Sequence, residues 1–272
     1  MAKIRRVFAV MLVFTLVSVM VPTTAFAAGV TATLDGRVIP GAKLIDSTTY
    51  LPLRAACESA GYTVGWQNAT ASATVSGKGV SLSVARDSIY LVANGRYIYL
   101  NGTARIIDGT MYIPARPLAK ALGWSVEWVN STQTAKLTSV GGAIRSGDSF
   151  YKEDEVLWLS RIISAEARGE SLLGQIAVGA VILNRVASPE YPNTIYGVIF
   201  DKQWGVQFEP TINGTIWNEP TASAVMAAKL ALDGANPVGG SLYFLNPAIA
   251  ESSWIPANRN FYSRIGNHSF YL

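Results

Sequence analysis

The sequence predicts two domains of different fold class: an N-terminal α+β domain of β-hairpins and short helices, duplicated within itself, and a C-terminal domain that is mostly α-helical. Residues 30–138 repeat one set of motifs at an offset of 62. Residues 151–272 instead contain long apolar runs with helical spacing. Between them, residues 139–150 read SVGGAIRSGDSF, a Gly- and Ser-rich composition that is typical of a linker.

Residues 1–27 have the composition of a secretory signal peptide. Basic residues at positions 3, 5 and 6 precede an apolar run from Val7 to Val21, and Ala25-Phe26-Ala27 matches a cleavage site. The run is short for a membrane span, and no Cys follows the cleavage site to accept a lipid. We therefore expect cleavage after Ala27, no stable membrane anchor afterwards, and a secreted or cell-wall location.

Cleavage would remove most of the net positive charge. The chain has 22 Lys and Arg against 18 Asp and Glu, and three of the basic residues lie in the signal segment, which leaves 19 against 18. Charged residues are 15% of the chain, below the usual value of about 25%. This composition argues against nucleic acid as a partner and fits an uncharged polymer surface.

The two halves of residues 30–138 predict the same order of elements. Hairpins with tight turns come first, at Asp35-Gly36 and Asn94-Gly95. A short helix that begins near a Pro follows, then a Gly and two more strands. The repeated motifs are YLPLR at 50–54 with YIPAR at 112–116, and GYTVGW at 61–66 with GWSVEW at 123–128.

The repeated aromatic residues allow two interpretations. Trp66 and Trp128, with Tyr50 and Tyr112, could face a glycan or the cell wall. Their identical placement is more simply explained by repeated core packing, which we favour. Cys57 is the only cysteine, so an intrachain disulfide is excluded, and its position in the short helix predicts a buried thiol.

Together these motifs resemble the copper amine oxidase N-terminal-like domain of many secreted Gram-positive proteins. The name implies no copper here, because residues 30–138 contain no His. We expect this domain to place the protein through a wall or protein partner.

The C-terminal half predicts three helices, at about 152–168, at about 171–187, and from near Pro220 to just before Gly234. The second is apolar on nearly every side and should be the buried central helix. Residues 189–218 are rich in Pro, Asn, Gly and aromatic residues. A long irregular stretch of this kind is where we expect a substrate cleft to be lined.

Glu166 is the candidate catalytic residue. Leu159, Ile163 and Glu166 follow at spacings of four and three and share one helix face. A carboxyl group on the core-facing stripe is poorly solvated, which favours its protonated form. A glycosidase needs such a group to protonate the leaving oxygen. The spacing alone leaves open that Glu166 is a solvated residue near a helix end.

The C-terminal half resembles the spore cortex-lytic enzyme family of cell-wall hydrolases. The blocks that carry the resemblance are SAEARGE, GQIAVGAVILNRV, PNTIYGVIF, GGSLYFLNP and RIGNHSFYL, in the family's order over residues 153–272. The resemblance implies a lysozyme-like domain that cuts peptidoglycan glycan strands in sporulation, germination or wall remodelling, with Glu166 at the catalytic position. Relatives often carry Cys where Gly240-Ser241 and Tyr271-Leu272 stand here.

Other residues are candidates for substrate binding. Gln207 and Phe208 stand where the family has a Gln-Phe pair, and an amide could hold an N-acetyl group while an aromatic ring stacks on a sugar. Tyr243, Phe244 and Asn246 could act in the same way. For the aromatic residues, ordinary core packing is the alternative.

A second catalytic carboxylate is not marked by spacing. The candidates are Glu170, Asp201, Glu209, Glu219 and Glu251. A lytic transglycosylase needs only one carboxyl group, acting first as acid and then as base, so we predict that reaction with Glu166 alone.

The predicted enzyme uses no cofactor and no metal, because one His and one Cys cannot supply the ligands of a usual zinc site. The same counts disfavour an amidase or endopeptidase. The remaining alternative is a non-catalytic wall-binding or scaffold protein with a degenerate lysozyme-like domain.

Overall fold

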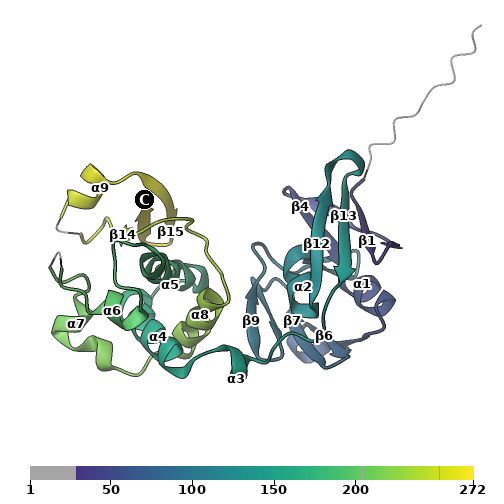
Figure 1. The fold of residues 1–272 in the computed structure, drawn as a ribbon, viewed down its shortest axis with the longest axis horizontal. Helices are drawn as coiled ribbons and strands as arrows, with labels where there is room; N and C mark the ends of the chain where they lie inside the picture. Colours follow the sequence, from purple (N-terminus) through teal and green to yellow (C-terminus); the bar gives the residue numbers. More distant parts are fainter. Residues whose placement is uncertain (1–28, 204, 251) are drawn as a thin grey trace, which may run out of the picture.

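The computed structural model describes residues 29–203, 205–250 and 252–272. The expected signal peptide at 1–27 and the candidate carboxylate of Glu251 lie outside the described residues. Two lobes stand side by side, a sheet-rich N-terminal lobe and a helical C-terminal lobe (Figure 1). The predicted change from a β-rich half to a helical half is therefore confirmed. None of the described helices is long and apolar enough to cross a membrane.

The N-terminal lobe contains three sheets and two short helices. The first sheet has the order β12-β13-β1-β2, the second β10-β11-β4-β3 and the third β5-β6-β7-β8-β9. The strands are β1 (Thr31–Leu34), β2 (Arg37–Ile39), β3 (Lys43–Ile45), β4 (Thr48–Pro52), β5 (Thr63–Gln67), β6 (Ser72–Gly77), β7 (Val80–Ala85), β8 (Tyr90–Ala93), β9 (Arg96–Tyr99), β10 (Arg105–Ile107), β11 (Thr110–Pro114), β12 (Trp124–Val129) and β13 (Thr134–Ser139). The helices are α1 (Leu53–Ser59) and α2 (Ala115–Leu122), with 3-10 turns η1 (Asn68–Thr70) and η2 (Asn130–Thr132).

Strand pairing joins distant parts of the N-terminal lobe. β1 pairs in parallel with β13, so the start of the lobe is held by its last strand. In the second sheet β4 and β11 are antiparallel, with Leu51 opposite Ile113, two residues whose separation equals the sequence offset of 62. The predicted tight turns are present, because Asp35 and Asn94 both have a φ of 49° and the glycine that follows each also has a positive φ.

One prediction for the repeated aromatic residues is wrong. Tyr50 and Tyr112 are buried as expected, but Trp66 is 42% exposed and Trp128 is 38% exposed. The two tryptophans lie on β5 and β12, which are edge strands of their sheets. Repetition in the sequence gives the two tryptophans equivalent positions in their sheets. On an edge strand, however, neighbouring elements cover a side chain only in part. Cys57 is buried as predicted, and burial raises the pKa of its thiol to about 12.

The C-terminal lobe is built around α5. The helices are α3 (Gly147–Phe150), α4 (Glu153–Ala167), α5 (Leu172–Ala187), α6 (Ile195–Ile199), α7 (Pro210–Asn213), α8 (Ala222–Leu232) and α9 (Trp254–Asn258), with a 3-10 turn η3 (Thr215–Trp217). α4 and α8 pack on α5. The three predicted helices are confirmed to within two residues at each end, and α3 is a short helix within the stretch that we expected to be a linker.

A small sheet completes the C-terminal lobe. Its strands β14 (Tyr243–Leu245), β15 (Phe261–Ile265) and β16 (His268–Tyr271) have the order β14-β16-β15. The starts of α5 and α8 are capped by side chains: Ser171 Oγ accepts from Gly174 N, and Thr221 Oγ1 accepts from Ala224 N.

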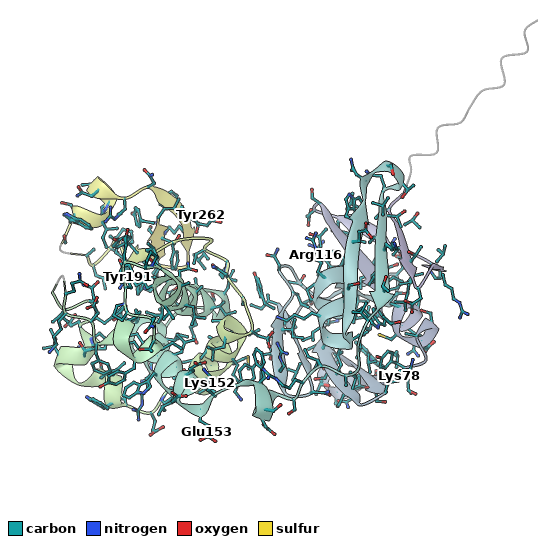
Figure 2. All side chains as sticks on the ribbon, in the orientation of Figure 1. Lys78, Arg116, Lys152, Glu153, Tyr191 and Tyr262 are labelled. Atoms are coloured by element: carbon teal, nitrogen blue, oxygen red, sulfur yellow. The ribbon has the colours of Figure 1, made fainter. Side chains whose placement is uncertain are left out.

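The two lobes are joined by a buried ion pair. Arg96 Nε donates to Asp233 Oδ2 at 2.7 Å, and Arg96 Nη2 donates to Oδ1 at 3.0 Å. Lys120 Nζ lies 2.5 Å from the same Oδ1. Around this carboxylate, Tyr97 and Tyr99 of β9 pack against the helical core of the C-terminal lobe. Arg116 lies on the edge of the N-terminal lobe that faces the helical lobe (Figure 2).

Candidate active site

A cavity of about 1330 Å³ opens in the C-terminal lobe, and we call it the main cleft. Its walls come from the end of α4, from residues 189–191, 203 and 206–209, from β14 and from the segment leading into α9. The predicted acid and all the predicted substrate-binding residues line it: Glu166, Gln207, Phe208, Tyr243, Phe244 and Asn246. Residues separated by as many as 80 positions in the chain therefore meet at one surface.

Glu166 lies in the last turn of α4, where the helix passes from the core to the cleft. Burial raises the pKa of its carboxyl group to about 7, and the neighbouring charge of Glu209 contributes in the same direction. Among the described residues, Glu166 makes no ion pair that would oppose this. A carboxyl group in this state can donate a proton near neutral pH.

The other predicted residues form a wall of the same cleft from residues 207–208 and 243–246. Gln207 Oε1 accepts from Arg185 Nη1 at 3.4 Å. Phe208 is only 4% exposed and packs against Phe244, so it is the least accessible of the predicted aromatic contacts. Asn246 Oδ1 accepts from Ala248 N at 3.0 Å, which shapes the turn after β14.

Two arginines that the sequence analysis missed organise this wall. Arg185 is buried, donates from Nε to the carbonyl oxygen of Leu242, and lies over the rings of Tyr191 and Tyr243. Arg259 donates from Nη2 to Tyr243 Oη at 2.9 Å and lies over the Trp254 ring. A charged residue inside the apolar run of α5 was the available signal for Arg185, because buried arginines need partners.

Glu170 ties the start of α5 to the β15–β16 turn. Its carboxylate accepts from Asn267 Nδ2 at 2.8 Å and from Asn267 N at 3.2 Å. His268 Nδ1 lies 3.7 Å from Glu170 Oε1, and burial lowers the pKa of that imidazole. These contacts occupy both oxygens of Glu170, which lines the main cleft together with His268.

The structure distinguishes the candidates for a second catalytic carboxylate by their position relative to the main cleft. Glu170 and Glu209 line the main cleft, whereas Asp201 and Glu219 are not among its lining residues. Since Glu170 is engaged by Asn267, Glu209 is the acid best placed to influence Glu166. Sequence spacing could not show this, because Glu209 comes from the irregular stretch.

Comparison with known proteins identifies relatives of both halves of the chain. A family model described as Cell Wall Hydrolase matches residues 169–271, and one described as Copper amine oxidase N-terminal domain matches residues 33–137. The spore cortex-lytic enzyme of Bacillus cereus is 40% identical over 120 residues, which are 44% of this chain and 45% of that enzyme. The chain thus spans less than half the length of that relative.

For two further relatives, the matched region covers a larger share of the relative's own length. The cell wall hydrolase CwlJ of Oceanobacillus iheyensis is 32% identical over 103 residues, which are 36% of this chain and 72% of that protein. The solved catalytic domain of the germination-specific lytic transglycosylase SleB from Bacillus anthracis is 38% identical, with a TM-score of 0.42, and the match covers 47% of this chain and 100% of that one. The chain belongs to the cell wall hydrolase family, and its N-terminal half is similar to the copper amine oxidase N-terminal domain. Both resemblances indicated by the sequence are confirmed.

Proposed function

We propose that this protein cleaves the glycan strands of peptidoglycan and that Glu166 is its catalytic acid. The observation that carries the proposal is the Glu166 carboxyl group, which lines a large cleft, has a pKa raised to about 7 and makes no ion pair among the described residues. The family's name and the spore cortex-lytic relatives support peptidoglycan as the substrate. Action on the cortex or another wall layer, after secretion, belongs to the same proposal.

The proposed reaction is a lytic transglycosylation. Glu166 gives its proton to the glycosidic oxygen as the bond from that oxygen to muramic acid C1 breaks. The C6 hydroxyl of the same muramic acid then attacks C1, and the Glu166 carboxylate takes the hydroxyl proton. A 1,6-anhydro ring forms, no water is consumed, and Glu166 ends in its starting protonation state.

A substitution at Glu166 tests the proposal. Glu166→Gln keeps the shape and removes the transferable proton, so we expect peptidoglycan cleavage to fall by about a hundredfold or more. The matched control is Glu153→Gln, a carboxyl group at the exposed start of the same helix, on the lower edge of the lobe (Figure 2). Unchanged turnover by a folded Glu166→Gln protein would support the non-catalytic scaffold instead.

The reaction type is tested by digestion in water enriched in heavy oxygen, followed by mass spectrometry of the fragments. We expect unlabelled 1,6-anhydro-muramic ends. Label at new reducing ends would identify a hydrolase, and Glu209 would then be the carboxylate to examine, because it lies next to Glu166 in the cleft.

The N-terminal lobe, as a duplicated domain, is proposed to hold the protein on the wall. The exposed Trp66 and Trp128, at equivalent positions of the two repeats, support this role, since indole rings stack well on sugar faces. Co-sedimentation of the protein with purified cell walls measures this wall binding. The double variant Trp66→Ala with Trp128→Ala should sediment less, and equal sedimentation would assign wall binding to the C-terminal lobe alone.

A further inference from the structure

Glu166 lines a second cavity in addition to the main cleft. This α4–α7 cavity has a volume of about 350 Å³ and is enclosed by the last turns of α4, by α7 and by residues 215–218. α7 lies beside α4 in the C-terminal lobe (Figure 1). Glu209 also lines both cavities. The two cavities therefore meet at Glu166 and Glu209.

Arg161 lines the α4–α7 cavity, and two neighbouring indole rings hold its guanidinium group in place. Its guanidinium carbon lies 5.2 Å from the ring centroid of Trp158 and 5.8 Å from that of Trp217. Its Nε is buried and has no hydrogen-bond partner in the described part of the chain, and Arg161 forms no ion pair there. The two indole rings orient the charge and leave its donors unused.

Other buried or half-buried arginines of the protein do have acceptors. Arg96 donates to the carboxylate of Asp233, Arg185 to the carbonyl oxygen of Leu242, and Arg259 to the hydroxyl of Tyr243. The Nε of Arg259 is buried without a partner as well, but its Nη2 has an acceptor, whereas Arg161 has no side-chain hydrogen bond to a described residue. Because a buried donor without an acceptor is costly, the acceptor for Arg161 is expected from a bound ligand. A planar guanidinium with adjacent free donors fits a carboxylate.

The chemistry of peptidoglycan restricts what that carboxylate can be. The sugar rings of the glycan strand are neutral, whereas the peptide stem on the lactyl group of each muramic acid carries free carboxylates. The stem is also the charged substituent closest to a glycosidic bond of muramic acid. We propose that the α4–α7 cavity binds a stem carboxylate next to the cleaved bond, with Arg161 as its ligand; this rests on the proposed function.

Two substrates and one substitution test the proposal. Kinetics would be measured on glycan strands whose peptide stems keep their free carboxylates and on the same strands after carbodiimide coupling with ammonia has converted those carboxylates to neutral amides. Arg161→Gln should lower kcat/KM on the strands with free stem carboxylates by roughly tenfold to a hundredfold, the range expected for a charged hydrogen bond, and should leave kcat/KM on the amidated strands unaffected. Arg264→Gln, which lines neither cavity, is the matched control.

The outcomes separate this proposal from the proposed function. An equal loss on both substrates, or no loss on either, would overturn the role of Arg161, while inactivity of the wild-type protein on both would overturn the function itself. If Arg161→Gln does not fold, Arg161→Lys decides. It keeps the charge and loses the planar fork, so its smaller loss should again be confined to the strands with free stem carboxylates, and an equal loss on the amidated strands would contradict the proposal.

Discussion

Glu166 and Asp233 are both withdrawn from water, but they lie in opposite electrostatic surroundings. Asp233 has a fully buried side chain with Arg96 and Lys120 at its oxygens. Glu166 has no ion-pair partner in the described chain, and another carboxylate, Glu209, lies nearby. Burial alone therefore does not set the role of a carboxyl group in this protein. The paired one joins two lobes, and the unpaired one retains a proton that can be transferred.

The largest effect on stability is expected at the paired carboxylate. Asp233→Asn leaves Arg96, whose side chain is 11% exposed, without its counter-charge. We expect the free energy of unfolding to fall by about 3 kcal/mol, as for other buried pairs that lose one partner. Urea denaturation measures the change. The control is the double variant Arg96→Met with Asp233→Leu, which should lose less; an unchanged midpoint for Asp233→Asn would remove the proposed contrast with Glu166.

Glu166→Gln should change stability in the opposite direction. The folded pKa near 7 lies above the ordinary value of 4.5, so the stability that Glu166 contributes is complete below pH 4.5 and is lost as the pH rises through 7. Glutamine does not titrate. The variant should thus match the wild type near pH 4 and exceed it by up to about 3 kcal/mol at pH 9. Thermal unfolding at both pH values tests this, and a gain that does not depend on pH would contradict it.

A smaller effect is expected from Glu209→Gln. This change removes the negative charge that helps to raise the pKa of Glu166, while burial, the larger cause, remains. Because the acid must be protonated, the alkaline limb of the pH–activity profile should move to lower pH by less than about one unit. Complete loss of activity would instead show that Glu209 takes part in the reaction.

The smallest effect is expected from Lys120→Met. Lys120 contacts the same carboxylate as Arg96, but its side chain is 44% exposed. A solvent-exposed ion pair contributes about 1 kcal/mol or less, so the change in the free energy of unfolding should stay below that. Urea denaturation at low and high salt measures it. A loss equal to that of Asp233→Asn would mean that Lys120, rather than Arg96, is the main partner.

The sequence by itself determined the local features of this protein. The apolar runs defined α4, α5 and α8, because helical periodicity is a property of neighbouring residues. The Asp-Gly and Asn-Gly pairs defined tight turns, since those residues tolerate a positive φ. The placement of Glu166 on a core-facing stripe indicated a carboxyl group with a raised pKa, but spacing alone did not exclude a solvated residue at the helix end; the folded structure buries it.

Tertiary structure decided the features that depend on distant residues. Strand pairing placed Trp66 and Trp128 on sheet edges and left them partly exposed, which repetition in the sequence could not show. The fold also brought Glu209 beside Glu166, placed Arg185 and Arg259 over the aromatic residues of the cleft, and buried Asp233 against Arg96. Charge–charge and ring–cation interactions act over a few ångströms in space, whatever the separation along the chain, and so only the folded molecule shows them.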